Sequence, residues 1–297
     1  MIQKNITSYQ KAFYRVLDYI DTHLDENLDL EKLSQVAAFS KYHFHRQFTG
    51  LFRISLFKYI KLVRLKRASY QLAFRKDIKI IDIAISSGFE NHESFTRAFK
   101  KNIGQTPSEF RNQPEWKSWN DKYQFLKNSR ILQMKSNQNK DKYQVEIVDF
   151  PGSQVAVFEH RGNPDLIGNS VQKFIEWSKQ NQISSNSRVI YNLVYDDPAT
   201  TEPEKYRFDI CVAVNSNVKE NNFGVIDKII PRGCCAMLRH IGTDENIAET
   251  VSYLYREWLP SSGKEPRDFP LFFHRVKSFP DFPEHEMIID IYLPLKG

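Results

Sequence analysis

The sequence has few cysteines and no long apolar run. Its three cysteines, Cys211, Cys234 and Cys235, are odd in number and lack the spacing of a metal site, and adjacent cysteines rarely bridge each other. The sequence has no run of about 18 apolar residues, the length that predicts a membrane helix. The opening MIQKNITSYQ also lacks the apolar stretch of a secretory signal. We therefore expect a cytoplasmic protein with reduced thiols, and without a membrane partner, a metal or a cofactor.

Common catalytic motifs are missing as well. The sequence contains no G-x-S-x-G, H-E-x-x-H or P-loop pattern, the motifs that mark many serine hydrolases, zinc proteases and nucleotide hydrolases. We therefore predict that the chain is not an enzyme.

Positive charge is in excess only in the first third of the chain. Residues 1–115 contain 19 Lys and Arg against 12 Asp and Glu, whereas residues 116–297 contain 23 against 24. This asymmetry favours a polyanion as the binding partner of the first part.

Apolar residues recur at helical spacing through residues 1–112. Asp29 is an expected N-cap, and Thr106 with Glu109 predicts a capping box. This part is therefore predicted to be an all-α domain.

The chain changes character after residue 112. Residues 113–142 are mostly polar and are predicted to be a linker, in which Trp116 and Trp119 could belong to one helix that packs on either domain. Residues 143–297 alternate short β-branched runs with two helical patterns, which predicts an α+β domain.

The helical part contains an internal repeat. A pattern of small and apolar residues recurs after fifty residues, and an F-x-R-x-F pattern recurs after fifty-one. In each copy a small residue lets two helices cross closely, and Ala38 or Gly88 occupies the turn between them, so each copy predicts one helix-turn-helix motif. The matched residues are Leu30, Leu33, Ser34, Ala38 and Phe39 with Ile80, Ile83, Ala84, Gly88 and Phe89, and Phe44, Arg46 and Phe48 with Phe95, Arg97 and Phe99.

The second half repeats itself at an offset of about eighty residues. The matched residues include Pro151, His160 and Asp209, with Pro231, His240 and Asp290. We therefore predict two tandem α+β modules related by a pseudo-two-fold axis. A cleft between two such modules is a favourable place for a ligand.

The segments LSQVAAFSKYHFHRQF and IIDIAISSGFENHESFTRAFKKNIGQTPSEFR resemble the double helix-turn-helix of the AraC family of bacterial transcription regulators. In that family the second helix of each motif enters the major groove. The resemblance implies double-stranded DNA as a partner and admits RNA polymerase as another. Carried over position by position, it implies the DNA-binding residues Lys41, Tyr42, His45, Arg46, His92, Glu93, Thr96 and Arg97.

The helix that joins the two motifs carries Lys61, Arg64, Lys66 and Arg67, which cannot all face DNA. Some of these cations should therefore remain solvated. Where the family usually has glycine after the first recognition helix, this chain has Arg53. A left-handed cap at an arginine would cost about 1 kcal/mol. The alternative is that the first motif ends in another conformation.

Residues 143–297 resemble the GyrI-like effector-binding domain, through VEIVDFPGSQVAVFEHRG, YRFDICVAV, SYLYREWLPSSG and IIDIYLPL. The resemblance implies a small-molecule effector. In several relatives a buried glutamate pairs with cationic drugs, but the matching position falls at about Phe273, so we do not expect that preference. The predicted effector-binding residues are Trp177, Tyr195, Tyr253, Glu257, Trp258, Phe272, Phe273, His274 and Tyr292.

The main hypothesis is a sequence-specific DNA-binding transcription regulator that a small-molecule effector controls. Two alternatives for the second half stay open. It could act as a hydrolase, for which Glu257 and His274 are the acid/base pair to nominate, or it could recognise another protein as a sensor.

Overall fold

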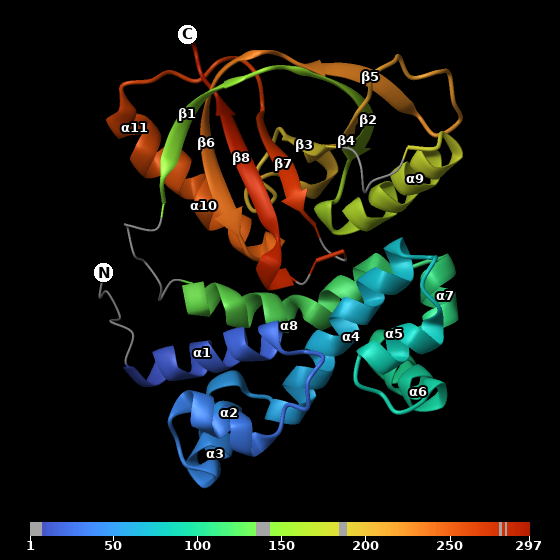
Figure 1. The fold of residues 1–297 in the computed structure, drawn as a ribbon, viewed down its shortest axis with the longest axis vertical. Helices are drawn as coiled ribbons and strands as arrows, with labels where there is room; N and C mark the ends of the chain where they lie inside the picture. Colours follow the sequence, from blue (N-terminus) through green and yellow to red (C-terminus); the bar gives the residue numbers. More distant parts are fainter. Residues whose placement is uncertain (1–7, 135–142, 184–188, 279–280, 283) are drawn as a thin grey trace. The chain divides into compact units, whose positions relative to one another are not determined.

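Two units, each with its own hydrophobic core, make up the fold. The computed structural model describes residues 8–134, 143–183, 189–278, 281–282 and 284–297. One unit holds helices α1 to α8, and the other holds an eight-stranded sheet with helices α9 to α11 (Figure 1). The predicted order, a helical helix-turn-helix region followed by a strand-rich domain, is confirmed.

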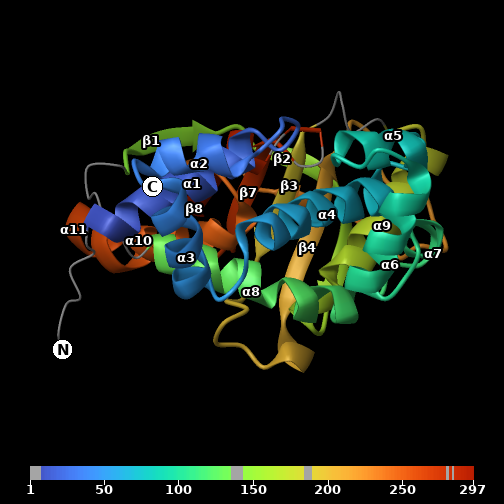
Figure 2. The same ribbon diagram turned by 90° about the horizontal axis from the view of Figure 1, so that it is seen from below.

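The first unit consists of two helix-turn-helix motifs joined by a long helix. Helices α2 and α3 form the first motif, α5 and α6 form the second, and α4 runs from one motif to the other (Figures 1 and 2). The bounds are α1 Ser8–Thr22, α2 Leu30–Ala37, α3 Lys41–Phe52, α4 Leu56–Phe74, α5 Ile80–Ser86, α6 His92–Ile103, α7 Pro107–Asn112 and α8 Trp116–Met134.

The caps and turns that the sequence predicts are present in this unit. Asp29 accepts a hydrogen bond from the backbone N–H three residues later, at 2.8 Å, and Thr106 with Glu109 forms a capping box. A left-handed residue lies between the two helices of each motif, with φ 58° at Ala38 and φ 75° at Gly88. The two helix-turn-helix motifs that the sequence repeat predicts therefore also share the backbone geometry of their turns.

Aromatic residues build the core of the first unit. Phe13 of α1 stacks on Phe44 of α3 with ring centroids 5.5 Å apart, and Phe48 is fully buried beside them. Phe95 and Phe99 occupy the corresponding positions of α6 and are also fully buried. These buried rings fix which side of each recognition helix remains exposed.

The segment 113–142 is not only a linker. Residues Trp116–Met134 form α8, and Trp116, Trp119 and Tyr123 are buried in the core of the first unit. Their spacing puts the three rings on one helical face, and this apolar face outweighs the polar composition of the segment. The helix that could have packed on either domain therefore belongs to the first unit; the rest of the expected linker, 135–142, lies outside the described residues.

Arg53 ends α3 in the left-handed conformation, with φ 55°. Its backbone N–H donates to the carbonyl of Thr49 at 2.8 Å. The first recognition helix thus ends in the geometry that usually favours glycine, although an arginine occupies the position.

The second unit is built on one antiparallel sheet in the strand order β1-β6-β8-β7-β3-β4-β2-β5. The strands are β1 Val145–Phe150, β2 Ser153–Arg161, β3 Ile190–Val194, β4 Arg207–Ala213, β5 Val225–Ile230, β6 Gly233–Ile241, β7 Leu271–Lys277 and β8 Ile288–Pro294. The helices of this unit are α9 Ile167–Gln180, α10 Ile247–Tyr253 and α11 Leu259–Ser262, and a π-helical turn Leu254–Trp258 joins the last two.

The two faces of this sheet have different coverings. On one, which we call the helical face, strand residues pack with Phe174 and Trp177 of α9 and with Leu254 that follows α10. On the other, which we call the aromatic face, strand residues pack around Phe150 and Phe272 without a helix among their described neighbours. Because successive strand residues alternate between faces, each strand contributes to both cores.

None of the described helices is long and apolar enough to span a membrane.

Candidate DNA interface and sensor sheet

Helix α3 presents a row of polar side chains opposite its buried phenylalanines. Tyr42 is 87% exposed, and His45 and Arg46 are also exposed, while Phe44 and Phe48 have no exposed surface. Lys41 is exposed at the start of the helix and forms an ion pair with Glu31 of α2 at 2.8 Å. The four predicted side chains on α3 are thus brought together on one accessible surface.

Helix α6 repeats this arrangement with one exception. His92, Glu93 and Arg97 are exposed, and Phe95 is buried on the other side of the helix. The hydroxyl of Thr96, however, is buried and has no hydrogen-bond partner among the described residues. Thr96 therefore does not offer its hydroxyl to a ligand in this conformation, unlike the other three predicted side chains.

The basic residues of α4 face different surroundings, as the sequence predicts. Lys61 is exposed, with its Nζ 5.9 Å from the centroid of the Phe89 ring. Lys66 is buried, and Arg64 and Arg67 donate hydrogen bonds to neighbouring backbone carbonyls of the same unit. Of these four cations only Lys61 lies on an exposed surface.

The predicted effector-binding residues do not form a single cluster. Trp177, Tyr253, Trp258 and Phe273 pack on the helical face, whereas Phe272 and Tyr292 pack on the aromatic face with Tyr195 beside them. Phe272 and Phe273 are consecutive in β7, so their side chains point to opposite faces. The structure therefore divides the predicted pocket between the two sides of the sheet.

Four aromatic rings lie together at the centre of the aromatic face. Phe272 stacks on Tyr292 with an interplanar angle of 2° and centroids 4.9 Å apart, and Phe150 contacts both rings. Tyr191 lies edge-on to Phe272 and 5.4 Å from the ring of His274. Burial raises the pKa of Tyr292 to about 12 and lowers the pKa of His274, so both side chains are held in their neutral forms.

The acid/base pair nominated for hydrolysis is not assembled. Glu257 lies in the π-helical turn whose neighbours Leu254 and Trp258 pack on the helical face. His274 follows Phe273 in β7 and points to the aromatic face beside Tyr191. The sheet separates the two groups, which removes the geometric basis for that alternative.

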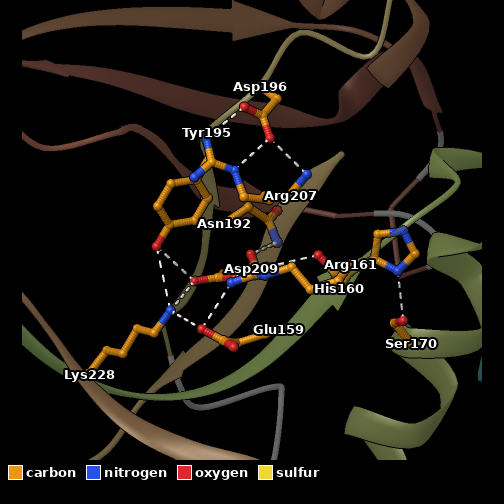
Figure 3. A network of polar contacts seen from close by, with 10 residues as sticks. All are labelled: Glu159, His160, Arg161, Ser170, Asn192, Tyr195, Asp196, Arg207, Asp209 and Lys228. Carbon is orange, nitrogen blue, oxygen red and sulfur yellow. Dashed lines mark hydrogen bonds and ion pairs between the residues drawn. The ribbon is translucent and has the colours of Figure 1, made fainter. Parts of the chain in front are cut away.

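Asp209 is the centre of a polar network on the aromatic face (Figure 3). Its fully buried carboxylate accepts hydrogen bonds from Arg161 Nη1 at 2.8 Å, Lys228 Nζ at 2.6 Å and the Tyr195 hydroxyl at 3.0 Å. Burial alone would lower the pKa of Lys228, but its hydrogen bonds to Asp209 and Glu159 raise that pKa overall. The ammonium group therefore stays charged inside the network.

The ring of Tyr195 is surrounded by cations. The charged groups of Arg161, Arg207 and Lys228 lie 5.7, 5.3 and 5.7 Å from its centroid, within the range of cation–π attraction. Arg207 is also paired with Asp196 at 2.8 Å (Figure 3). Positive and negative side chains alternate around Tyr195, so the network is balanced in charge.

Two buried histidines repeat one hydrogen-bond pattern in the two halves of the unit. His160 has Nδ1 2.8 Å from the Ser170 hydroxyl (Figure 3). Its Nε2 lies 3.1 Å from the carbonyl of Asn163. His240 has the same two contacts, at 2.9 Å to the Thr250 hydroxyl and 3.1 Å to the carbonyl three residues later. Because a carbonyl can only accept, we assign a proton to Nε2 of each ring.

Asp209, Lys228 and Arg161 are not among the residues that the sequence patterns mark as a site. A usable signal was present, since Asp209 interrupts the apolar run RFDICVAV and Lys228 interrupts VIDKII. Charged residues are almost never fully buried without a partner. Such interruptions therefore predict a buried ion pair, although they do not identify its members.

Comparisons with known proteins match both parts of the chain. Residues 143–296 match the model of the GyrI-like small molecule binding domain, and residues 33–113 match that of a helix-turn-helix domain. The chain is 40% identical over 152 residues to the probable transcriptional regulator YgiV of Escherichia coli K12, covering 51% of this chain and 95% of that protein.

Further similarities extend to another regulator and to a solved complex. The chain is 41% identical over 103 residues to the uncharacterized HTH-type transcriptional regulator YbfP of Bacillus subtilis, covering 35% of each chain. The cryo-EM structure of the EcmrR–DNA complex in EcmrR-RPo aligns with 90% of this chain and 99% of that chain, at 16% identity and a TM-score of 0.44.

Proposed function

The chain belongs to the GyrI-like small-molecule binding domain family, which it joins to a helix-turn-helix domain, and we propose that it is a transcription regulator controlled by an effector. In this proposal the first unit reads duplex DNA and the second unit binds a small molecule. The observation that carries the DNA part is the duplicated recognition helix. Both α3 and α6 bury phenylalanines, three in α3 and two in α6, and both expose an arginine and a histidine.

We propose seven side chains as DNA contacts. Their exposed positions on α3 and α6 suit insertion into two successive stretches of the major groove. Arg46 and Arg97 are the candidates for bidentate contacts to guanine, and Thr96 is left out because its hydroxyl is buried. The seven residues are Lys41, Tyr42, His45, Arg46, His92, Glu93 and Arg97.

The test is a selection of binding sites from a random duplex library with the full-length chain. We expect one enriched site, bound about 10- to 100-fold more weakly by Arg46→Ala and by Arg97→Ala. Lys122→Ala removes an equally exposed charge from α8 and should change affinity little. If the chain enriches no sequence, with or without added compounds, the DNA part of the proposal is wrong.

We propose further that the sensor consists of two related halves. If β1 to β4 are equated with β5 to β8, the strand order of the sheet reads the same from both ends. The contacts of His160 and His240 recur in the same way. Both observations support a pseudo-two-fold axis between β3 and β7, where the two halves meet.

For the effector we propose the aromatic face of the sheet. Tyr195, His274 and Tyr292 are only partly buried there, beside the stacked ring of Phe272, and flat rings suit a planar ligand. Trp177 and Phe273, in contrast, are buried in the core of the helical face. An effector on the aromatic face would lie next to the network of Asp209.

The effector proposal can be tested with a library of planar aromatic compounds, read by the melting temperature of the full chain. A compound that stabilises the wild type should lose its effect in Tyr292→Leu and keep it in Trp258→Leu, whose change lies on the helical face. The reverse pattern would move the effector to the helical face. Stabilisation by an added bacterial extract that is lost after removal of its proteins would instead favour a protein-binding sensor.

A further inference from the structure

Two arginines of the connecting helix reach both helix-turn-helix motifs. Arg64 and Arg67 lie three residues apart on α4 and therefore project from the same side of this helix. Arg64 donates from Nε to the carbonyl of Leu24 at 3.0 Å and from Nη2 to the carbonyl of Glu26 at 2.7 Å. Both carbonyls belong to the segment between α1 and α2, which leads into the first motif.

The same guanidinium group of Arg64 lies against the turn of the second motif. A Cβ atom placed on Gly88 would come within 2.5 Å of Nη1 and 2.8 Å of Cζ of Arg64. Gly88 is the left-handed residue between α5 and α6. Its lack of a side chain therefore serves two purposes, because it permits the turn and gives space to the arginine from α4.

Arg67 makes an equivalent pair of contacts. Its Nη2 donates to the carbonyl of Ser86, the last residue of α5, at 2.6 Å. Its two terminal nitrogens also hold the carboxylate of Asp25, in the segment that leads into the first motif. Each arginine thus contacts the turn region of the second motif and the segment 24–26 that leads into the first.

These contacts restrict the rotation of the two motifs relative to the connecting helix. A rigid helix sets the distance between two motifs, but it does not by itself fix the rotation of each motif about its own attachment. The planar fork of a guanidinium, held between the segment that leads into the first motif and the turn of the second, restricts that rotation. Burial and the neighbouring charge of Arg67 lower the pKa of Arg64, and the guanidinium keeps its hydrogen bonds to the carbonyls of Leu24 and Glu26.

We propose that Arg64 and Arg67, which we call the arginine clamp, are positioning residues that set the relative orientation of α3 and α6 and thereby the spacing between the two half-sites that the chain accepts. The clamp acts through the motifs and does not contact DNA. This inference rests on the proposed DNA binding.

The test uses the full chain and the site obtained by selection, together with versions in which one base pair is inserted or removed between the half-sites. One base pair turns the half-sites by about a tenth of a helical turn. We expect the wild type to lose about 10-fold in affinity for either altered spacing. We call the affinity for the selected spacing divided by the affinity for an altered spacing the spacing ratio. Arg64→Lys and Arg67→Lys keep the positive charge but lose the planar guanidinium, and they should reduce the spacing ratio to about 2-fold or less.

Two controls separate positioning from general damage. Lys58→Arg changes an exposed cation on the same helix and should keep the wild-type ratio. A duplex with only the first half-site should be bound equally by the wild type and the clamp variants, because each motif stays intact. Should Arg64→Lys not fold, as judged by circular dichroism, Asp25→Asn weakens the clamp at an exposed acid and receives the same measurement.

The outcomes distinguish this inference from the function on which it rests. A wild-type ratio retained by folded clamp variants would overturn the clamp and leave DNA reading intact, as would a wild type that binds its site equally well at all three spacings. Failure of the wild type to prefer any sequence would instead overturn the proposed function itself.

Discussion

Lys228 of β5 places its ammonium group 2.6 Å from the carboxylate of Asp209 in β4, across the intervening strand β2. Asp209 has no exposed surface, whereas the Lys228 side chain keeps a quarter of its own. The pair therefore ties the edge strand β5 to the interior of the sheet. Its counterpart in the other half is simpler, because among the described residues Asp290 accepts side-chain hydrogen bonds from the half-exposed Arg239 alone.

This difference predicts unequal effects of two matched substitutions. Asp209→Asn removes the buried negative charge that pairs with Lys228 and Arg161 and should destabilise the second unit by about 3 kcal/mol. Asp290→Asn frees an arginine that water already reaches, so about 1 kcal/mol is expected. Urea denaturation followed by far-ultraviolet circular dichroism gives both values, and equal losses would contradict the distinction.

The left-handed end of α3 predicts a stabilising substitution. Arg53→Gly removes the strain of a residue with a Cβ atom at φ 55° and should raise the free energy of unfolding of the first unit by about 1 kcal/mol. Thr49→Gly, inside the same helix, should instead lower it by about 0.5 kcal/mol. A lower urea midpoint for Arg53→Gly would show that the arginine side chain contributes more than the strain removes.

The buried hydroxyl of Thr96 predicts that this residue can be changed without loss of DNA binding. Thr96→Val keeps the shape of the side chain and its methyl group but removes a polar atom that has no partner among the described residues, so stability should rise by up to about 1 kcal/mol. Affinity for the selected site should stay within 2-fold of the wild type, whereas Arg97→Ala should lower it clearly. Fluorescence anisotropy with labelled duplex measures both, and a large loss for Thr96→Val would return Thr96 to the contact surface.

The neutral state of His160 predicts a pH-dependent stability. Burial lowers its pKa below the ordinary 6.5, so below that pH the unfolded chain takes up a proton that the folded chain does not. The contribution of His160 is therefore fully present above pH 6.5 and is lost as the pH falls. Melting temperatures at pH 8 and pH 5.5 should differ less in His160→Gln than in the wild type, and an equal difference in both would exclude His160 as a source.

Local features of the first unit could be predicted from the sequence because they depend on neighbouring residues. The caps at Asp29 and Thr106 and the turn at Gly88 follow from residue type and position, and the turn at Ala38 follows from its match to Gly88 in the repeat. The clamp could not be predicted in this way. A basic residue on a helix looks the same in sequence whether it contacts solvent, as Lys61 does, or backbone carbonyls forty residues away, as Arg64 does.

In the second unit, the sequence likewise predicts the strands but not which face of the sheet the helices cover. The strands and the α+β composition follow from alternating patterns, and the alternation of Phe272 and Phe273 could already have separated these two residues. Which of the two faces would lie under helices depends on long-range packing. The network of Asp209 depends on it too, because its members come from β2, β4 and β5 and from the residue after β3.

The place of β8 in the sheet has a consequence for how the chain matures. This strand comes last among the described strands, yet it lies between β6 and β7 near the centre of the sheet, and β1 pairs with β6 almost ninety residues later. The first unit, by contrast, is all-helical, and many of its helices pack with their sequence neighbours, which favours rapid folding. During synthesis, the first unit can therefore fold on the ribosome before β8 of the second unit has been made. The helix-turn-helix unit thus reaches its native structure before the sheet of the second unit is complete.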